Sequence, residues 1–249
     1  MHPIVYYIIF FLAIGGVGMA IANRKVNPQV RQQRWLKYFT YIIFTGTVVI
    51  SIFYNFFYWL AWLISVAGLV ELLRINFSKP AKPFVNLMLS LLVFMIIAGG
   101  FILFSFSFKN SFLLFIYFQV LVFDGFCQIT GQLFGKHALA PSISPAKTWE
   151  GLAGGWACCM IAAMLAANWI FVPVSTALLF GLLTGATSFS GDILASWYKR
   201  KAEIKDYSNW LPGQGGFLDR FDSLLCTAAI YFFLCITIFR DGFDSFIKV

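Results

Sequence analysis

Long apolar segments separated by short polar stretches recur along the whole chain. Each segment has enough residues, about 20, for a helix to cross the hydrocarbon core of a lipid bilayer. The apolar runs are continuous rather than alternating, which favours helices over the strands of a membrane barrel. The predicted spans are 3–22, 39–54, 56–73, 84–107, 112–131, 152–171, 174–195 and 224–240. The pattern therefore predicts an all-α fold, a polytopic transmembrane bundle of about eight helices, with a range of about seven to nine.

The acidic residues divide this predicted bundle into two parts. Residues 1–110 contain a single acid, Glu71, whereas residues 120–222 contain seven. No linker, low-complexity tract or repeat interrupts the chain, so a single membrane domain over residues 1–249 is expected. Within it, we interpret 1–110 as scaffold helices and 112–240 as catalytic helices with their cytoplasmic loops.

The positive charges predict how the helices are oriented. The chain is 60% hydrophobic and 11% charged, with a mean hydropathy of +0.82 and a net charge of +8. Of its 18 cations, only Lys109, Arg240 and Lys248 fall outside one alternate set of loops. Short cytoplasmic loops carry an excess of Lys and Arg, so these basic loops should face the cytoplasm and both termini the other side. Orientation explains the basic charge, and no nucleic-acid partner is expected.

The first polar cluster runs from Asp124 to Lys136. Asp124 and Gln128 are four residues apart and share a helix face. An acid at the end of a span is costly unless it is paired, hydrated or bound to a metal, so an interhelical pair and a metal ligand are both open readings. Gly131 and Gly135 suit either close helix packing or backbone approach to a phosphate.

The second cluster runs from His137 to Gly151. Ser144 and the following proline predict a helix start, with Lys147 and Thr148 in its first turn. A helix N-terminus of this kind suits an anion, although simple capping is the alternative. Glu150 could accept hydrogen bonds from a nucleotide or pair with Lys147. His137 has no partner carboxylate at catalytic spacing and is assigned no role.

The third cluster lies between Lys199 and Ser223. Asp219 and Asp222 would share a face if the last helix starts near Leu218. Paired carboxylates at a helix start suit Mg²⁺, and Asp192 on the neighbouring span could join them. The alternative is that the two acids only interact favourably with the positive, N-terminal end of the helix dipole. The glycines before Asp219 could curl around a phosphate or simply form a turn.

Together these three stretches resemble, in the same order, the motifs of the CDP-diacylglycerol synthases (phosphatidate cytidylyltransferases), which are integral membrane enzymes. The first stretch matches an Asp, then Gly, then Phe-Gly-Lys pattern that CTP-dependent polyprenol and phytol kinases share more loosely. The second resembles Ser-Pro-Lys-Lys-Thr-Trp-Glu-Gly. The third carries the signature residues Ser196, Lys199, Arg200, Lys205, Asp206, Gly215, Gly216, Asp219, Arg220 and Asp222.

Four positions depart from the family pattern. Cys127 replaces a small Ala, which is a mild change, Ala146 replaces a Lys, Gln132 stands where Arg is common, and Gln214 replaces a His. Glutamine neither shuttles protons nor carries charge near neutral pH, so any acid–base role of that His is absent. A cytidylyltransferase acting on another lipid phosphate, such as an ether or isoprenoid lipid, is therefore a serious alternative.

The resemblance implies transfer of a cytidylyl group from CTP to a lipid phosphate. The expected lipid is phosphatidic acid, which gives CDP-diacylglycerol and pyrophosphate. A CTP-dependent lipid kinase and a non-catalytic membrane lipid-binding relative are the further alternatives. The enzyme would be a multi-pass protein of the bacterial inner membrane or an equivalent one, in contact with membrane lipids and with a homodimer as one option.

The resemblance also assigns roles to residues. The expected catalytic residues are Asp219, Asp192, Lys205, Asp206 and Arg220. The expected substrate-binding residues are Ser144, Lys147, Thr148, Glu150, Lys199, Arg200, Gln214, Gly215 and Gly216. The cofactor would be Mg²⁺, with a second cation as an option. Its expected ligands are Asp219, Asp192, Asp124 and Asp222.

Overall fold

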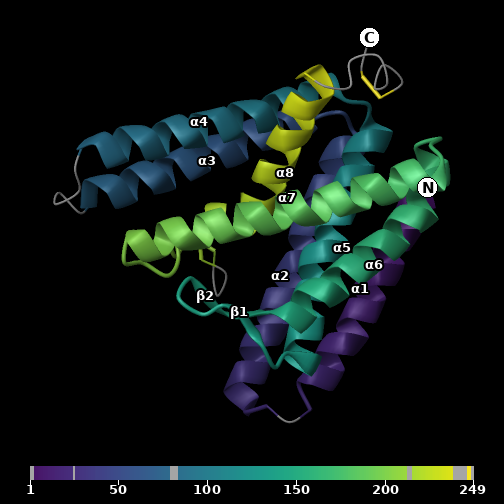
Figure 1. Cartoon of the computed structure of the whole chain (residues 1–249), viewed down its shortest axis with the longest axis horizontal. Helices are drawn as coiled ribbons and strands as arrows, with labels where there is room; N and C mark the ends of the chain where they lie inside the picture. Colours follow the sequence, from purple (N-terminus) through teal and green to yellow (C-terminus); the bar gives the residue numbers. More distant parts are fainter. Residues whose placement is uncertain (1–2, 25, 79–83, 212–214, 238–245, 248–249) are drawn as a thin grey trace. The chain divides into compact units, whose positions relative to one another are not determined.

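The computed structural model is helical throughout, apart from one short hairpin (Figure 1). It describes residues 3–24, 26–78, 84–211, 215–237 and 246–247. Its helices are α1 (Pro3–Ala22), α2 (Pro28–Phe53), α3 (Phe57–Ser78), α4 (Phe84–Ser107), α5 (Asn110–Phe134), α6 (Trp149–Ala166), α7 (Val174–Lys201) and α8 (Leu218–Thr237), with a 3₁₀ turn, η1, at Ala167–Trp169. Within the described residues, seven helices, α1 to α7, are long and apolar enough to cross a membrane. The predicted all-α polytopic membrane fold is therefore confirmed.

Several helices continue beyond the predicted apolar spans into the polar residues that flank them. α2 begins at Pro28 rather than at residue 39, because proline suits the first helical position and the Asn27 side chain accepts a hydrogen bond from the backbone N–H of Gln29 at 3.1 Å. α7 continues to Lys201, and its last turn holds three cations, which favour the negative end of a helix dipole. α8 begins at Leu218, as the placement of Asp219 and Asp222 on one face requires.

The chain divides into two compact units. Unit 1 comprises residues 1–49 and 111–189, and unit 2 comprises residues 50–110 and 190–249. α2 and α7 each contribute residues to both units. The interpretation of the chain as one membrane domain, with scaffold and catalytic parts, stays a prediction.

Unit 1 is held together by hydrogen bonds between helices and by small residues at helix contacts. The Tyr38 hydroxyl on α2 donates to the Leu12 carbonyl on α1, and the Tyr41 hydroxyl donates to the Leu121 carbonyl on α5 at 2.9 Å. Gly155 of α6 lies directly against Cys127 of α5, where a larger side chain would not fit. Small residues at such positions let membrane helices approach closely.

Unit 1 also contains the hairpin. β1 (Ala138–Ala140) and β2 (Ser144–Thr148) pair in antiparallel fashion, with Ala140 opposite Ser144 and Ala138 opposite Thr148. The hairpin joins the end of α5 to the start of α6.

In unit 2, α3 and α4 run side by side and α8 packs against both (Figure 1). A Cβ placed on Gly100 of α4 would lie 2.8 Å from the Cβ of Ala229 on α8. A Cβ on Gly191 of α7 would lie 2.6 Å from the Cβ of Cys226 on α8 and 2.9 Å from the Asp222 carbonyl oxygen. Gly100 thus lets α4 approach α8, and Gly191 lets α7 approach the first turns of α8, where the third polar cluster is located.

Candidate functional site

The hairpin of unit 1 corrects the expected helix start at Ser144. Residues 144–148 form strand β2, and α6 begins only at Trp149, with Thr148 as its N-cap. A residue that precedes a proline rarely adopts helical backbone angles. Ser144 precedes Pro145 and lies opposite Ala140 in the strand pair. The Thr148 side chain already accepts a hydrogen bond from the backbone N–H of Gly151 at 3.1 Å. The prediction that Ser144, Lys147 and Thr148 share a first helical turn is therefore wrong.

Glu150 and His137 tie the two ends of the hairpin together. The Glu150 carboxylate accepts hydrogen bonds from the backbone N–H groups of Lys136 and His137, at 3.1 and 3.2 Å. Its other oxygen lies 2.5 Å from Nδ1 of His137. His137 thus has a carboxylate partner 13 positions away, which the sequence analysis missed. The structure places Glu150 in this contact, so that it organises the hairpin.

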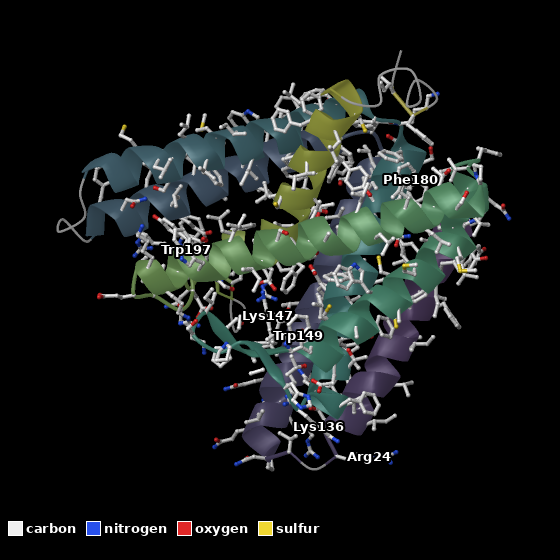
Figure 2. The ribbon with its side chains drawn as sticks, viewed as in Figure 1. Arg24, Lys136, Lys147, Trp149, Phe180 and Trp197 are labelled. Carbon is white, nitrogen blue, oxygen red and sulfur yellow. The ribbon has the colours of Figure 1, made fainter. Side chains whose placement is uncertain are left out.

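The ammonium group of Lys147 is a buried positive charge in the hairpin. Its Nζ atom is shielded from solvent and lies 5.5 Å from the centre of the Phe189 ring. Figure 2 labels Lys147 and Trp149 at the point where β2 leads into α6. The Lys147 ammonium group therefore lies within the range in which a cation is attracted to an aromatic ring.

Asp124, on α5, accepts a hydrogen bond from the Ser188 hydroxyl on α7 at 2.7 Å. This agrees with the interhelical reading of the acid and does not by itself supply a metal site. Gly131 and Gly135 lie against Thr148, with a hypothetical Cβ at 3.3 Å from its Oγ1 for Gly131 and at 2.8 Å for Gly135. Their closeness favours packing of α5 on the hairpin over backbone contact with a phosphate.

Unit 2 contains the other group of predicted residues, centred on Asp219. One Asp219 oxygen pairs with Nζ of Lys199 at 2.6 Å. The other oxygen accepts hydrogen bonds from the backbone N–H of Tyr207 at 2.7 Å and of Gly216 at 2.8 Å. The side chains of Asp219 and Lys199 are only 3% and 13% exposed. Asp219 therefore joins α7, the loop after it and the start of α8 through one carboxylate.

Glu71 is a member of this group that the sequence analysis placed among the scaffold helices. It lies on α3, is fully buried, and accepts hydrogen bonds from the backbone N–H groups of Phe217 and Leu218, both at 2.9 Å. It also accepts a hydrogen bond from the Ser208 hydroxyl at 2.5 Å. An acid at a helix N-terminus satisfies donors that have no partner within the helix. Glu71 thus fixes both the loop before α8 and the first turn of α8.

The two glycines of the signature lie between these carboxylates. Gly215 has a φ of +84°, and a Cβ there would lie 2.8 Å from an Asp219 oxygen and 3.2 Å from Asp206. A Cβ on Gly216 would collide with the Glu71 carboxylate. Gly215 is needed because glycine alone combines a left-handed backbone with such close approach, and Gly216 is needed because no Cβ fits beside the Glu71 carboxylate. Gln214 lies outside the described residues.

The remaining predicted residues of unit 2 differ in exposure. Asp192 and Asp222 are half-buried on α7 and α8, and the Ser196 hydroxyl lies 3.5 Å from an Asp192 oxygen. Arg200 donates to the Ile204 carbonyl at 3.5 Å. Arg200, Lys205, Asp206 and Arg220 are exposed at the surface around the loop. Burial raises the pKa of the Tyr207 phenol, and the negative charges of Asp222 and Asp219 raise it further.

The donor set of unit 2 is compatible with Mg²⁺. The described residues include no group of three or more His, Cys, Asp or Glu side chains placed to hold a metal ion. Magnesium, however, usually keeps several waters and binds through one or two carboxylates together with substrate phosphates. Asp192 and Asp222 are half-buried carboxylates of the kind that suits this mode. Asp222 also accepts a hydrogen bond from the backbone N–H of Ser223 at 2.8 Å, and Asp219 binds three donors.

Comparison with known proteins decides the family. The model of the cytidylyltransferase family matches residues 2–238. The chain belongs to the cytidylyltransferase family. Over 222 residues it is 32% identical to a phosphatidate cytidylyltransferase of Rickettsia felis, with 83% of this chain and 94% of that protein covered. The family expected from the three motifs is therefore confirmed.

Two further relatives match a shorter segment of the chain. A phosphatidate cytidylyltransferase of Haemophilus influenzae is 40% identical over 132 residues, which cover 49% of this chain and 43% of that protein. The Escherichia coli protein YnbB is 44% identical over 105 residues, covering 41% of this chain and 35% of YnbB.

Proposed function

We propose that this multi-pass membrane protein is a phosphatidate cytidylyltransferase. An oxygen of the lipid phosphate attacks the α-phosphorus of CTP and forms a new P–O–P bond. The bond from the α-phosphorus to the β-phosphate oxygen breaks, and pyrophosphate leaves. Phosphatidic acid as acceptor gives CDP-diacylglycerol. The family match across residues 2–238 is the observation that carries this proposal.

The arrangement in unit 2 supports this chemistry. Transfer at a phosphorus atom depends mainly on positioning and on neutralisation of charge. Asp219 and Glu71 accept hydrogen bonds from the backbone N–H groups of Gly216 and Phe217, and they hold the glycine loop (residues 215–217) beside the first turn of α8. Arg200, Lys205 and Arg220 are exposed beside that loop, where they can contact phosphate oxygens. Asp206, also exposed, lies next to Gly215 and keeps its predicted catalytic role.

We assign the divalent cation to Asp192 and Asp222, with substrate phosphates completing its ligands. When bound, Mg²⁺ would neutralise phosphate charge during the transfer. Asp219 then acts as a positioning residue, since its oxygens are bound to Lys199 and to two backbone N–H groups. Asp124 accepts a hydrogen bond from Ser188 and stays a predicted ligand only.

The unit 1 hairpin is proposed to contact CTP through Lys147, which lies in strand β2. Its buried ammonium group supports this role, because a shielded charge attracts a triphosphate more strongly than a solvated one. Ser144 and Thr148 stay predicted substrate contacts. Glu150 supports the hairpin through His137. We further propose that these loops face the cytoplasm of a bacterial inner membrane, because the basic residues gather in one set of loops.

Labelled CTP tests the proposed reaction. Purified full-length protein in detergent is incubated with Mg²⁺, phosphatidic acid and CTP labelled at either the α- or the γ-phosphorus. Cytidylyl transfer puts the α label into the lipid and the γ label into pyrophosphate. A lipid kinase would instead need an alcohol acceptor, put the γ label into lipid and release CDP. Label from γ in the lipid fraction would contradict the proposal.

The lipid specificity follows from a panel in the same assay. Phosphatidic acid, an ether-linked analogue and an isoprenyl phosphate are compared at equal concentration. We expect the highest kcat/KM with phosphatidic acid. A higher value with the ether or isoprenyl lipid would move the assignment to that lipid while leaving the reaction type unchanged.

A further inference from the structure

Unit 2 contains a cavity of about 370 Å³ whose walls come from α3, α4, α7 and α8. Most of the wall is aliphatic or aromatic. Pockets of this size and polarity are typical of small-molecule sites. Seven of the 18 residues in the wall come from α3 and α4, which the sequence pattern marks only as scaffold helices.

Three uncharged polar side chains of the wall, Asn76, Ser90 and Tyr198, are turned toward one another, whereas Lys201 and Asp222 are its charged members. The Tyr198 hydroxyl donates to Oδ1 of Asn76 at 3.0 Å. Nδ2 of Asn76 donates to the Leu72 carbonyl at 2.9 Å and lies 3.5 Å from the Ser90 hydroxyl. Buried polar groups that are satisfied internally gain nothing from a polar ligand. The cavity therefore suits a hydrocarbon occupant rather than a headgroup.

The cavity borders the proposed catalytic residues. Asp222, Tyr207 and Leu218 belong to its wall. The backbone N–H of Tyr207 is bound by Asp219, and that of Leu218 is bound by Glu71. An occupant that carries a phosphate at one end can thus place it at the Asp222 end of the cavity, where a divalent cation held by Asp222 would offset the repulsion between the two anions, while the rest of the molecule lies along the apolar wall.

The cavity also reaches the outer surface of the helices. Leu89, Val93, Leu194 and Trp197 belong to its wall and are 58%, 47%, 53% and 47% exposed. They come from α4 and α7, both apolar enough to cross a membrane. Nζ of Lys201 lies 5.1 Å from the ring centre of Trp197, which is labelled in Figure 2. Such a pair is typical of the membrane–water interface. Hydrocarbon chains of the bilayer are therefore the molecules that meet this opening.

The length of the cavity fits one hydrocarbon chain of a lipid. Along α4 the wall extends from Leu89 to Ile97, roughly 12 Å at 1.5 Å per residue. Along α7 it extends from Gly191 to Lys201, roughly 15 Å by the same rise, which is about half of the ~30 Å hydrocarbon core.

We infer that this cavity binds one acyl chain of the lipid phosphate substrate, with the phosphate beside Asp222 and the chain between α4 and α7. The inference rests on the proposed function and deepens it. On this inference, Val93 and Leu194 determine which acyl-chain lengths the enzyme accepts in its lipid substrate. It also explains why α3 and α4, which lack the signature motifs, belong to the working part of the molecule.

Two tryptophan variants test the inference by kinetics. Val93→Trp narrows the cavity from α4 and Leu194→Trp narrows it from α7. Leu92→Trp is the matched control, since Leu92 is 59% exposed and lies outside the wall. We expect the two wall variants to raise the KM for dioleoyl phosphatidic acid at least tenfold, with the KM for CTP and the KM for dihexanoyl phosphatidic acid unchanged. An equal effect of Leu92→Trp would overturn the inference.

Photolabelling tests the same site without turnover. Purified full-length protein is irradiated with phosphatidic acid that carries a diazirine in one acyl chain, with no CTP present. We expect labelled peptides from α4 and α7, reduced in Val93→Trp, and competed by unlabelled phosphatidic acid but not by phosphatidylcholine. Equal competition by both lipids would make this a bulk-lipid surface and overturn the inference.

The two experiments separate the inference from the proposed function. Labelling of α4 and α7 in a protein that makes no liponucleotide from any lipid phosphate would support the cavity and contradict the function. Normal cytidylyl transfer with label outside these helices would overturn the cavity and leave the function standing. Thermal stability in detergent is measured for every variant, so that a folding defect is recognised before the kinetics are interpreted.

Discussion

Glu71→Ala should impair both the stability and the turnover of this enzyme, although Glu71 lies on an apolar helix without signature motifs. The substitution removes the acceptor for three hydrogen bonds, from the backbone N–H groups of Phe217 and Leu218 and from the Ser208 hydroxyl. The hydroxyl can rotate to another partner, whereas the two backbone donors cannot. Each buried donor left without a partner costs about 1–3 kcal/mol, so we expect a loss of about 3 kcal/mol.

Glu71→Gln should cause a smaller loss than Glu71→Ala. The amide keeps one oxygen, which can still accept one backbone hydrogen bond, but its NH₂ group faces the other donor. We expect a loss of about 1–2 kcal/mol, corresponding to one buried backbone donor. Ser208→Ala is the control, because it removes only the hydroxyl partner of Glu71 and should cost about 1 kcal/mol or less.

The assay combines thermal unfolding in detergent with steady-state kinetics. If Glu71 positions the glycine loop, kcat should fall in the order wild type, Gln, Ala at temperatures where every variant is folded. A residue with only a structural role would lower the melting temperature and leave kcat unchanged for the folded protein. A Glu71→Ala variant with wild-type melting temperature and kcat would refute the reasoning.

Four further predictions follow from the same contacts. Gly216→Ala should abolish most activity because its methyl group meets the Glu71 carboxylate, whereas Gly99→Ala, with no atom within 4 Å of its Cβ, should keep wild-type kinetics. Asp219→Asn should lower the rate of liponucleotide formation. It should also lower the free energy of unfolding by about 3 kcal/mol, and with it the melting temperature, because Lys199 is left buried without its counter-charge. An unchanged melting temperature would argue against a stabilising Asp219–Lys199 pair. Lys147→Ala should raise the KM for CTP more than Lys136→Ala, which removes an exposed cation; equal KM values would make Lys147 an orientation charge only. In whole cells, an impermeant thiol reagent should modify Asn110→Cys and spare Gln33→Cys, and the opposite pattern would reverse the predicted orientation.

The helices could be predicted because their signal is local. A span needs about 20 apolar residues in a row, and this requirement placed α1 and α4 at their observed bounds. The start of α8 was also predictable, since acids favour the first helical turn. The ends of α2 and α7 were predicted too short, because hydropathy marks the part of a helix inside the bilayer and not its polar extension.

The hairpin and Glu71 could not be predicted in the same way. Ser144 with its following proline fits a helix start equally well, and the extended conformation depends on pairing with Ala140 and on packing against Gly131 and Gly135. Glu71 contacts residues 137 to 147 positions away, which no periodicity reveals. One signal was present, however. A lone acid within a span is costly unless it has partners, and this argument applied to Glu71 as well as to Asp124.

The most direct test of the central claim is the stoichiometry of the reaction with the purified, full-length protein. Liponucleotide and pyrophosphate are quantified together from CTP and phosphatidic acid, with Mg²⁺ removed by a chelator and then restored, for the wild type and for Asp222→Asn. The account predicts one pyrophosphate for each CDP-diacylglycerol, dependence of both on Mg²⁺, and joint loss of both in the variant. Consumption of CTP without liponucleotide, or wild-type turnover of Asp222→Asn at limiting Mg²⁺, would contradict it.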